Sequence, residues 1–264
     1  MGKHGSNVDT LMLAHFDTSD QQITLISIPR DLYVNERKIN SVYAAYGIKE
    51  QARVVGEVLG LVIQNYVLVD MYVFRDLIDL LGGVDIILQE DLVDPSYKVC
   101  EDGLCSSLYY EAGPHHLDGT AALRVARSRH STSDYSRAER QQLILEALMG
   151  ELKAMDLTDI STLGSLAHTA LAATETNFNL QQVLTYAIKY KDFSVSGGNV
   201  ISTANVLAAN PVPVDYVTSH PIQVCEVPEN PATCKTQYAI DTLGPVNGNW
   251  DAIKWYVQQV LNQN

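Results

Sequence analysis

The feature that most constrains this fold is the alternation of strand-like and helix-like segments over the first 153 residues. Residues 9–16 and 23–28 are β-rich runs separated by six polar residues, so they predict a hairpin. The segments that follow are a predicted helix at 50–61, strand at 66–74, helix at 75–81, strand at 84–88, helix at 120–126 and long helix at 137–153. This alternation predicts an α/β fold with helices on both faces of a sheet.

The rest of the chain gives weaker signals. Residues 91–114 are polar and predicted to be loop. Three later segments have helical periodicity, namely 160–171, 180–190 and 250–261. The proline-containing segments 210–214 and 226–231 predict rigid loops. Because no Pro/Gly/Ser-rich linker divides the chain, we expect a single domain over residues 1–264.

A cluster of arginines is the strongest functional signal. Five of the nine arginines fall within seventeen residues: Arg124, Arg127, Arg129, Arg137 and Arg140. Guanidinium groups at this density repel one another unless an anion lies among them, and their planar fork binds phosphate oxygens bidentately. The formal net charge of -13 argues against nucleic acid, which needs a broad basic face. The cluster therefore indicates a local anion site, with pairing to surface carboxylates as the alternative.

The second half of the cluster carries a helix signal. Ser136 and Glu139 have the spacing of a capping box ahead of an apolar periodic run. Arg137 and Arg140 are then predicted to share one face of the first helical turn, where unpaired N–H groups and the helix dipole favour an anion.

Two further positions are candidates for binding phosphate or a metal ion. Arg30 and Asp31 directly follow Pro29 at the end of a predicted strand, at the sheet edge where α/β folds commonly bind ligands, so Arg30 is a sixth candidate phosphate ligand. Asp9 opens a predicted strand and could hold Mg²⁺ against the same phosphates. The alternatives are an exposed arginine and an ordinary turn-forming aspartate.

The cysteines indicate the compartment. They occur as two local pairs, Cys100 with Cys105 and Cys225 with Cys234, which predict disulfides and an oxidising, extracytoplasmic setting. A four-cysteine zinc site is the alternative, although its usual spacing is closer. No run of 18 apolar residues exists, and residues 1–7 do not have the apolar stretch of a signal peptide.

In their order and spacing, these motifs resemble the LytR-CpsA-Psr family of bacterial cell-envelope phosphotransferases. The matching segments lie within residues 9–153: Asp9-Thr10, 27–31, 38–40, 81–84, 117–119 and 127–142. The resemblance implies a three-layer α/β/α sandwich around a central mixed β-sheet. It also implies transfer of a glycan phosphate from a polyprenyl-pyrophosphate carrier to a cell-wall acceptor such as peptidoglycan, outside the cytoplasmic membrane.

Carried over position by position, the resemblance implies specific roles. The residues expected to bind the pyrophosphate are Arg30, Arg127, Arg129, Arg137, Arg140 and Gln141. Asp9 is expected to coordinate Mg²⁺, and Asp9, Arg30 and Arg127 are the expected catalytic residues.

Two departures from the family pattern leave alternatives open. Asn7 stands where family members usually carry arginine, and an upstream strand with a further aspartate is expected to be missing, together with an N-terminal membrane anchor. A catalytically silent domain that binds the lipid carrier therefore remains an alternative to the transferase. A second alternative is a hydrolase, in which water replaces the acceptor hydroxyl at the same pyrophosphate.

Overall fold

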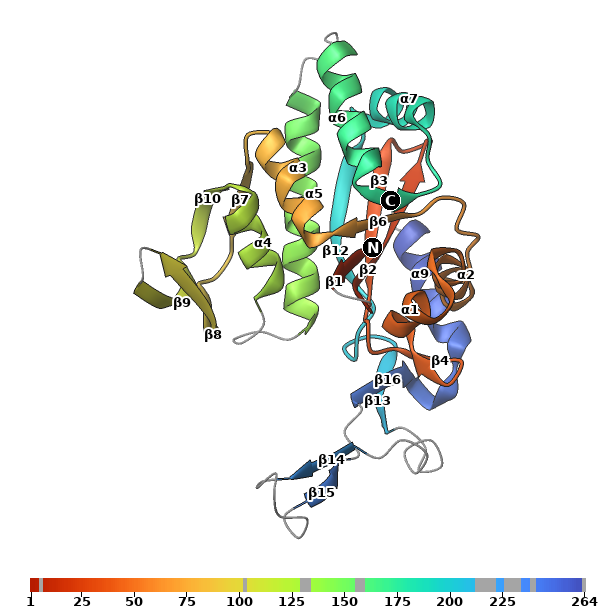
Figure 1. Ribbon diagram of the computed structural model, residues 1–264. Coiled ribbons are helices and arrows are strands. Elements are labelled where there is room, and N and C mark those ends of the chain that lie inside the picture. The colour runs from red at the N-terminus through yellow and green to blue at the C-terminus, as the bar shows by residue number, and fades with distance from the viewer. Residues whose placement is uncertain are drawn as a thin grey trace.

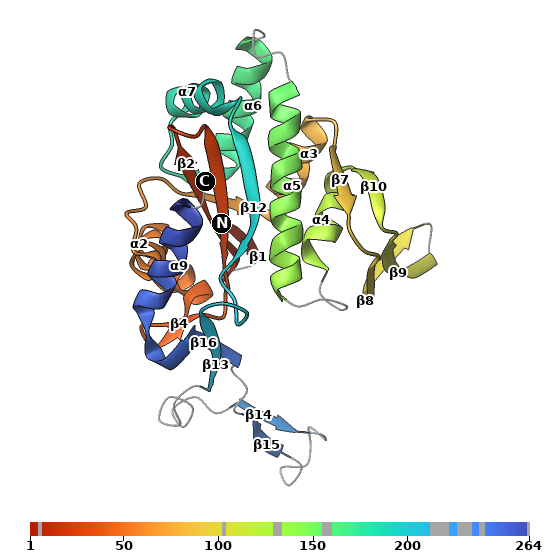
Figure 2. The same cartoon turned by 180° about the vertical axis from the view of Figure 1, so that it is seen from behind.

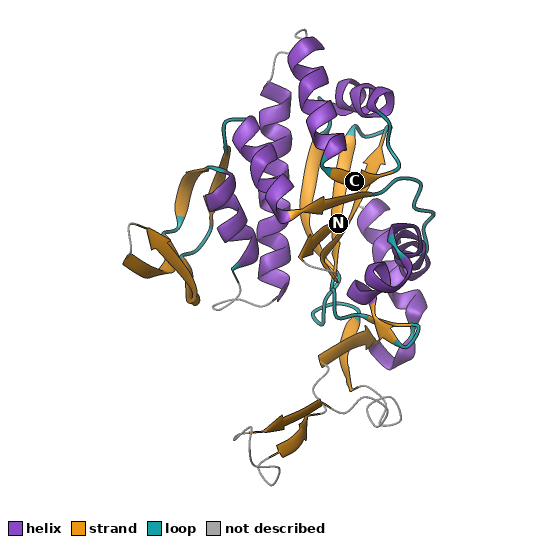
Figure 3. Ribbon diagram, in the orientation of Figure 1, coloured by secondary structure: helices purple, strands orange, loops and turns teal. Residues whose placement is uncertain are grey.

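The structure is a computed structural model that describes residues 1–4, 7–101, 104–128, 134–154, 160–211, 222–225, 234–237 and 241–262. It has a mixed α/β fold (Figure 1, Figure 3). The largest sheet has six strands in the order β11 (Thr174–Thr176), β6 (Val67–Asp70), β1 (Gly2–His4), β2 (Asn7–Asp17), β3 (Gln22–Ile28) and β12 (Ser194–Val200). The sheet is mixed, because β1 runs parallel to β6 and β12 parallel to β3, whereas β2 and β3 form the predicted antiparallel hairpin.

Helices pack against this sheet from two sides. One core joins β2 and β3 to α2 (Ile48–Leu59) and α9 (Trp250–Asn262). α5 (Asp134–Ala154) packs against β12, and Figures 1 and 2 show it on the opposite side of the sheet from α2 and α9. A second core joins α5 to α4 (Gly119–Arg127), α3 (Met71–Leu80) and β7 (Val84–Leu88).

The smaller elements complete the chain. They are β4 (Tyr33–Val34), β5 (Arg37–Lys38), η1 (Ile39–Ser41), α1 (Val42–Tyr46), α6 (Ile160–Ala172), α7 (Leu180–Tyr190), β13 (Leu207–Pro211), β14 (Ile222–Cys225), β15 (Cys234–Gln237), β16 (Asp241–Pro245) and η3 (Val246–Gly248). The three helices predicted in the last hundred residues are confirmed as α6, α7 and α9. Among the described residues, no helix combines the length and apolar character needed to cross a bilayer.

The predicted strand at 66–74 is wrong in its second half. β6 ends at Asp70, and α3 begins at Met71, four residues before the predicted helix. The carboxylate of Asp70 accepts a hydrogen bond from the Tyr72 N–H at 2.7 Å and so caps the helix. The N-cap residue therefore decided the boundary, against the β propensity of the residues that follow it.

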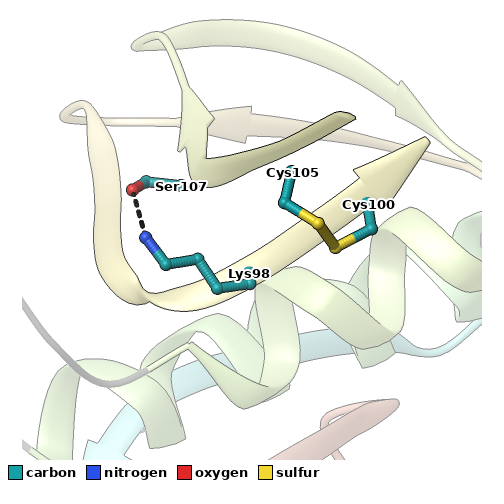
Figure 4. Close-up of a disulfide and its surroundings, with 4 residues drawn as sticks. All are labelled: Lys98, Cys100, Cys105 and Ser107. Carbon is teal, nitrogen blue, oxygen red and sulfur yellow. Dashed lines mark hydrogen bonds between the residues drawn. A yellow bond between two sulfur atoms is a disulfide. The ribbon is translucent and has the colours of Figure 1, made fainter. Parts of the chain in front are cut away.

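The predicted loop at 91–114 is also wrong. It contains the hairpin of β8 (Leu92–Glu101) and β9 (Leu104–Tyr110), and it reaches the start of β10 (Gly113–Leu117), which pairs with β7. A disulfide joins Cys100 to Cys105 across the hairpin, which confirms that predicted pair (Figure 4). Cys225 and Cys234 face each other in the β14–β15 register, but their side chains lie outside the described residues.

Two other local predictions need correction. Ser136 is the third residue of α5 and not its N-cap, so Arg137 remains in the first turn while Arg140 falls in the second. Asn210 and Pro211 lie in β13, which pairs with β16, and not in a loop. The rest of that predicted loop and the segment 226–231 lie outside the described residues.

Candidate functional site

A cavity of about 570 Å³ lies where the sheet meets α3, α4, α5 and β8. Its polar lining consists of Asp9, Thr10, Arg30, Asp70, Asp94, Ser96, Tyr97, Arg127, Arg137 and Gln141. Its apolar lining consists of Met1, Met12, Val69, Met71, Phe74, Leu123, Ala126 and Leu145. Five of the seven residues predicted for the site thus line one cavity, although up to 132 positions separate them in the chain.

Asp9 and Arg30 form an ion pair at the sheet side of the cavity. A terminal guanidinium nitrogen of Arg30 lies 2.7 Å from Oδ1 of Asp9, and the two side chains are 22% and 33% exposed. The pair continues to Asp31, whose carboxylate contacts Arg30 Nε at 3.4 Å and Lys38 Nζ at 2.6 Å. Negative and positive side chains therefore alternate in this series of ion pairs, and the pairs fix the orientation of Arg30 toward the cavity.

Arg127 and Arg137 reach the cavity from two helices. Arg127 is the last residue of α4, and Arg137 lies in the first turn of α5, where its side chain is buried. Gln141, one turn further along α5, donates from Nε2 to the carbonyl of Ala126 at 3.0 Å. This bond ties the end of α4 to α5, so the two arginines are held relative to each other.

Arg140 and Arg129 stand differently from the other predicted arginines. Arg140 is not one of the described residues that line the cavity. Its buried guanidinium donates to the carbonyls of Val125 at 3.2 Å and Ser128 at 2.6 Å, and burial lowers the pKa of Arg140. It thus satisfies carbonyls at the C-terminal end of α4, where a cation is favourable. Arg129 lies outside the described residues.

Four polar cavity residues lie outside the motifs singled out in the sequence, namely Asp70, Asp94, Ser96 and Tyr97. Asp94 is almost completely buried, and its Oδ1 accepts from the Ser96 N–H, the Ser96 hydroxyl and the Tyr97 N–H. The sequence Asp94-Pro95-Ser96 carries the signal of such a turn. That signal had marked the segment only as a loop, because nothing in it showed that β8 lies against the arginine segment.

The carboxylates around the cavity are dispersed. Within the ranges that the structure describes, no group of three or more His, Cys, Asp or Glu side chains could hold a metal ion. Asp70 caps α3 and Asp94 holds the turn in β8, while Asp9 pairs with Arg30. A divalent cation bound here would therefore depend on oxygens brought by the ligand and by water.

Comparison with known proteins identifies the family. The LytR_cpsA_psr family model matches residues 1–211. This chain belongs to the LytR_cpsA_psr family. The match extends the resemblance, which covered residues 9–153, through β13.

Curated relatives carry transferase names. The polyisoprenyl-teichoic acid–peptidoglycan teichoic acid transferase TagV of Bacillus subtilis (strain 168) is 30% identical over 196 residues, which is 70% of this chain and 49% of TagV. TagT of the same organism, which bears the same transferase name, is 29% identical over 163 residues, 58% of this chain and 50% of TagT. This chain thus spans about half the length of these relatives.

Solved structures share the fold. The crystal structure of B. subtilis TagV superposes with a TM-score of 0.66 at 24% identity, over 96% of this chain and 89% of that one. A structure of TagT bound to LIIa-WTA gives a TM-score of 0.64 at 19% identity, over 99% of this chain and 87% of that one. At this identity the likeness establishes the common fold.

Proposed function

We propose that this chain transfers a glycan phosphate from a polyprenyl-pyrophosphate carrier to a hydroxyl group of a bacterial cell-wall polymer, with peptidoglycan as the acceptor class. The observation that carries the proposal is the composition of the cavity. Arg30, Arg127 and Arg137 come from three separate elements and line it together with Asp9, while the rest of the lining is mostly apolar. Such a cavity fits one ligand that joins a pyrophosphate to a hydrocarbon chain.

The proposed reaction uses this chain's residues mainly for positioning and charge neutralisation. The acceptor hydroxyl attacks the phosphorus that carries the glycan, and a new P–O bond forms as the hydroxyl loses its proton to water. The bond from this phosphorus to the bridging oxygen breaks, so that the bridging oxygen leaves on polyprenyl monophosphate. Negative charge increases on the bridging oxygen as it leaves and is also carried by the non-bridging phosphate oxygens, where Arg30, Arg127 and Arg137 stabilise it. We assign Asp9, Arg30 and Arg127 as catalytic residues.

We extend the proposal to Mg²⁺ with Asp9 as its protein ligand. Mg²⁺ retains several waters and is commonly held by one or two carboxylates plus substrate phosphates, so one cavity-facing carboxylate beside a pyrophosphate is a compatible donor set. Bound there, the ion would neutralise phosphate charge. Asp9 is engaged by Arg30 through Oδ1, so Arg30 also orients the carboxylate.

We further propose a three-layer α/β/α sandwich forming one domain over residues 1–264 that works at the outer face of the membrane. The opposed packing of α5 and of α2 with α9 supports the layers. The Cys100–Cys105 disulfide supports an oxidising compartment. The transferase names of the relatives support the acceptor class.

The test is a transfer assay. The protein is mixed with a polyprenyl-pyrophosphate disaccharide, peptidoglycan fragments and Mg²⁺, and products are followed by mass spectrometry. The proposal requires polyprenyl monophosphate and a phosphodiester-linked product in equal amounts, both reduced at least tenfold in Arg127→Ala. Free glycan phosphate in place of the linked product identifies a hydrolase, and binding without any release identifies a silent carrier-binding domain. Omission of Mg²⁺ and Asp9→Asn separately test the metal assignment.

A further inference from the structure

Resting on the proposed function, we propose that Asp94 is a positioning residue that sets Arg127 through Ser128, and that Arg140 braces the same point from the other side. We call Asp94, Ser128 and Arg140 the Asp94 network. The inference makes the disulfide-closed β8–β9 hairpin part of the pyrophosphate site. It also gives Arg140 a positioning role in place of the phosphate contact expected from the sequence.

The network converges on Ser128, the residue directly after Arg127. The Ser128 hydroxyl donates to Oδ2 of Asp94 at 3.0 Å, and the Ser128 carbonyl accepts from Arg140 at 2.6 Å. Asp94, Ser128 and Arg140 are 2%, 0% and 8% exposed. Because both bonds are buried and each has one charged partner, they resist displacement by water. The backbone that carries Arg127 is therefore fixed from two directions.

The other oxygen of Asp94 shapes a bulge in β8. The β8–β9 register runs regularly to Asp94 opposite Leu108 and resumes at Lys98 opposite Ser107, so three residues of β8 are extra. Asp94 Oδ1 holds this bulge by accepting from Ser96 and Tyr97, and both of these residues line the cavity. A bulge is a common means of redirecting side chains beside a binding site.

The hairpin is closed on the far side of the bulge. The Cys100–Cys105 disulfide and a 3.3 Å hydrogen bond from Lys98 Nζ to the Ser107 hydroxyl join the two strands there (Figure 4). The hairpin projects beside α4, away from the six-stranded sheet (Figures 1 and 2). The Asp94 carboxylate thus links the disulfide-closed β8–β9 hairpin to the end of α4.

The chain contains a matched control for Asp94. Asp17 begins a turn with the same three hydrogen bonds, accepting from the Ser19 N–H, the Ser19 hydroxyl and the Asp20 N–H. It lies at the opposite end of β2 from Asp9, about 26 Å away at 3.3 Å per residue. Asp17→Ala therefore removes an equivalent turn without touching the cavity.

The first experiment needs no ligand. Hydrogen exchange is measured on α4, where the Ser128 N–H donates to the Arg124 carbonyl. Asp94→Ala should accelerate exchange at Ser128 by about tenfold, the effect expected for one lost hydrogen bond to a charged group, whereas Asp17→Ala should leave it unchanged. Ser128→Ala removes a single oxygen and replaces Asp94→Ala if the latter does not fold. If the exchange rate at Ser128 is unchanged in the variant that folds, the proposal that Asp94 fixes the end of α4 is overturned.

The second experiment measures binding of farnesyl pyrophosphate by calorimetry. We expect Asp94→Ala to weaken binding about tenfold in the parent. Ser128→Ala breaks the bond to Asp94 Oδ2 but leaves the turn at Ser96 and Tyr97. It should also weaken binding and should have no further effect in an Arg127→Ala background, because Ser128 acts through Arg127. Additive losses would refute this. Asp94→Asn should restore binding, since its carbonyl can hold the turn and its amide can donate to the Ser128 hydroxyl. Failure of Asn to rescue would mean that the charge of Asp94 itself is needed.

Arg140 is tested in the same titration. Arg140→Lys keeps the charge but cannot reach both carbonyls, so it should weaken binding about as much as Asp94→Ala and likewise have no further effect without Arg127. An effect independent of Arg127 would assign Arg140 as a direct ligand. If the parent itself does not bind farnesyl pyrophosphate, the proposed function fails, while the exchange measurement still decides whether the network fixes α4.

Discussion

Replacement of Gln142 should cost the protein a large share of its stability. Gln142 is 1% exposed in the middle of α5 and joins that helix to two strands. Its Nε2 donates to the Ser27 hydroxyl at 2.8 Å and to the Asn199 carbonyl at 2.9 Å, while its Oε1 accepts from the Gly198 N–H. The bond to Gly198 lies in the irregular stretch of β12, between Ser196 and Asn199.

The magnitude follows from these bonds. Gln142→Met keeps most of the volume but breaks three hydrogen bonds, one to the buried Ser27 and two in the partly buried stretch at Gly198 and Asn199. At about 1 kcal/mol for each bond, the free energy of unfolding should fall by about 3 kcal/mol. For a chain of 264 residues, unfolding entropy scales to a fall in melting temperature of roughly 6 °C. Urea unfolding followed by circular dichroism measures the first quantity, and calorimetry the second.

Gln181→Met is the control, because Gln181 is an exposed glutamine of α7. It should change the free energy of unfolding by no more than about 0.5 kcal/mol. The reasoning is refuted if Gln142→Met unfolds within that margin of the parent. Since α5 carries Arg137 and Gln141 while β3 leads to Arg30, Gln142→Met should also raise the KM of the transfer reaction more than it lowers kcat.

Three further predictions concern separate parts of the molecule. Arg137→Ala should weaken farnesyl pyrophosphate binding by about 1.5 to 3 kcal/mol, as expected for charged hydrogen bonds. Calorimetry measures this affinity, and Arg53→Ala, at an exposed arginine, is the control. An affinity equal to that of the parent would leave Arg137 with a structural role only. The double variant Cys100→Ser, Cys105→Ser should have a free energy of unfolding about 2 kcal/mol lower than the parent, since the disulfide closes a short loop. Denaturant titration of the variant and of the oxidised parent measures this difference. An unchanged free energy of unfolding would show that the hairpin is held by its hydrogen bonds alone. The pKa of His116 is raised above its ordinary value of 6.5, mainly by the hydrogen bond to Asp85 and also by that to the Gly82 carbonyl, so its contribution to stability is complete below about pH 6.5 and disappears as the pH rises through the raised pKa. The melting temperature should therefore decline between about pH 6 and pH 8 less steeply in His116→Gln than in the parent, and identical slopes would contradict the prediction.

Local pattern predicted much of the fold. The β2–β3 hairpin and helices α2, α6, α7 and α9 appear within a few residues of their predicted positions, because their periodicity and turn residues agree with the environment they meet. The predictions at 66–74 and 91–114 failed where one residue's hydrogen bonds decide the outcome. Asp70 ends a strand by capping a helix, and Asp94 accommodates a bulge inside a strand.

The sequence predicted several residues that line one cavity, but it did not predict how they are arranged. Charge density on an acidic chain pointed to Arg127 and Arg137, and the strand-ending proline pointed to Arg30, all of which line the cavity. Charge alone could not separate Arg140, whose guanidinium meets backbone carbonyls, from its neighbours. That distinction depends on where α4 ends relative to α5, which is a tertiary relation.

The parallel pairing of β12 with β3 has a consequence for biosynthesis. Asn199 donates to the Leu25 carbonyl across 174 positions of sequence, so β3 has an open edge until β12 has left the ribosome. Contacts of this separation slow folding, and an open strand edge invites pairing with other chains. We therefore expect refolding from denaturant to be slow and strongly dependent on protein concentration.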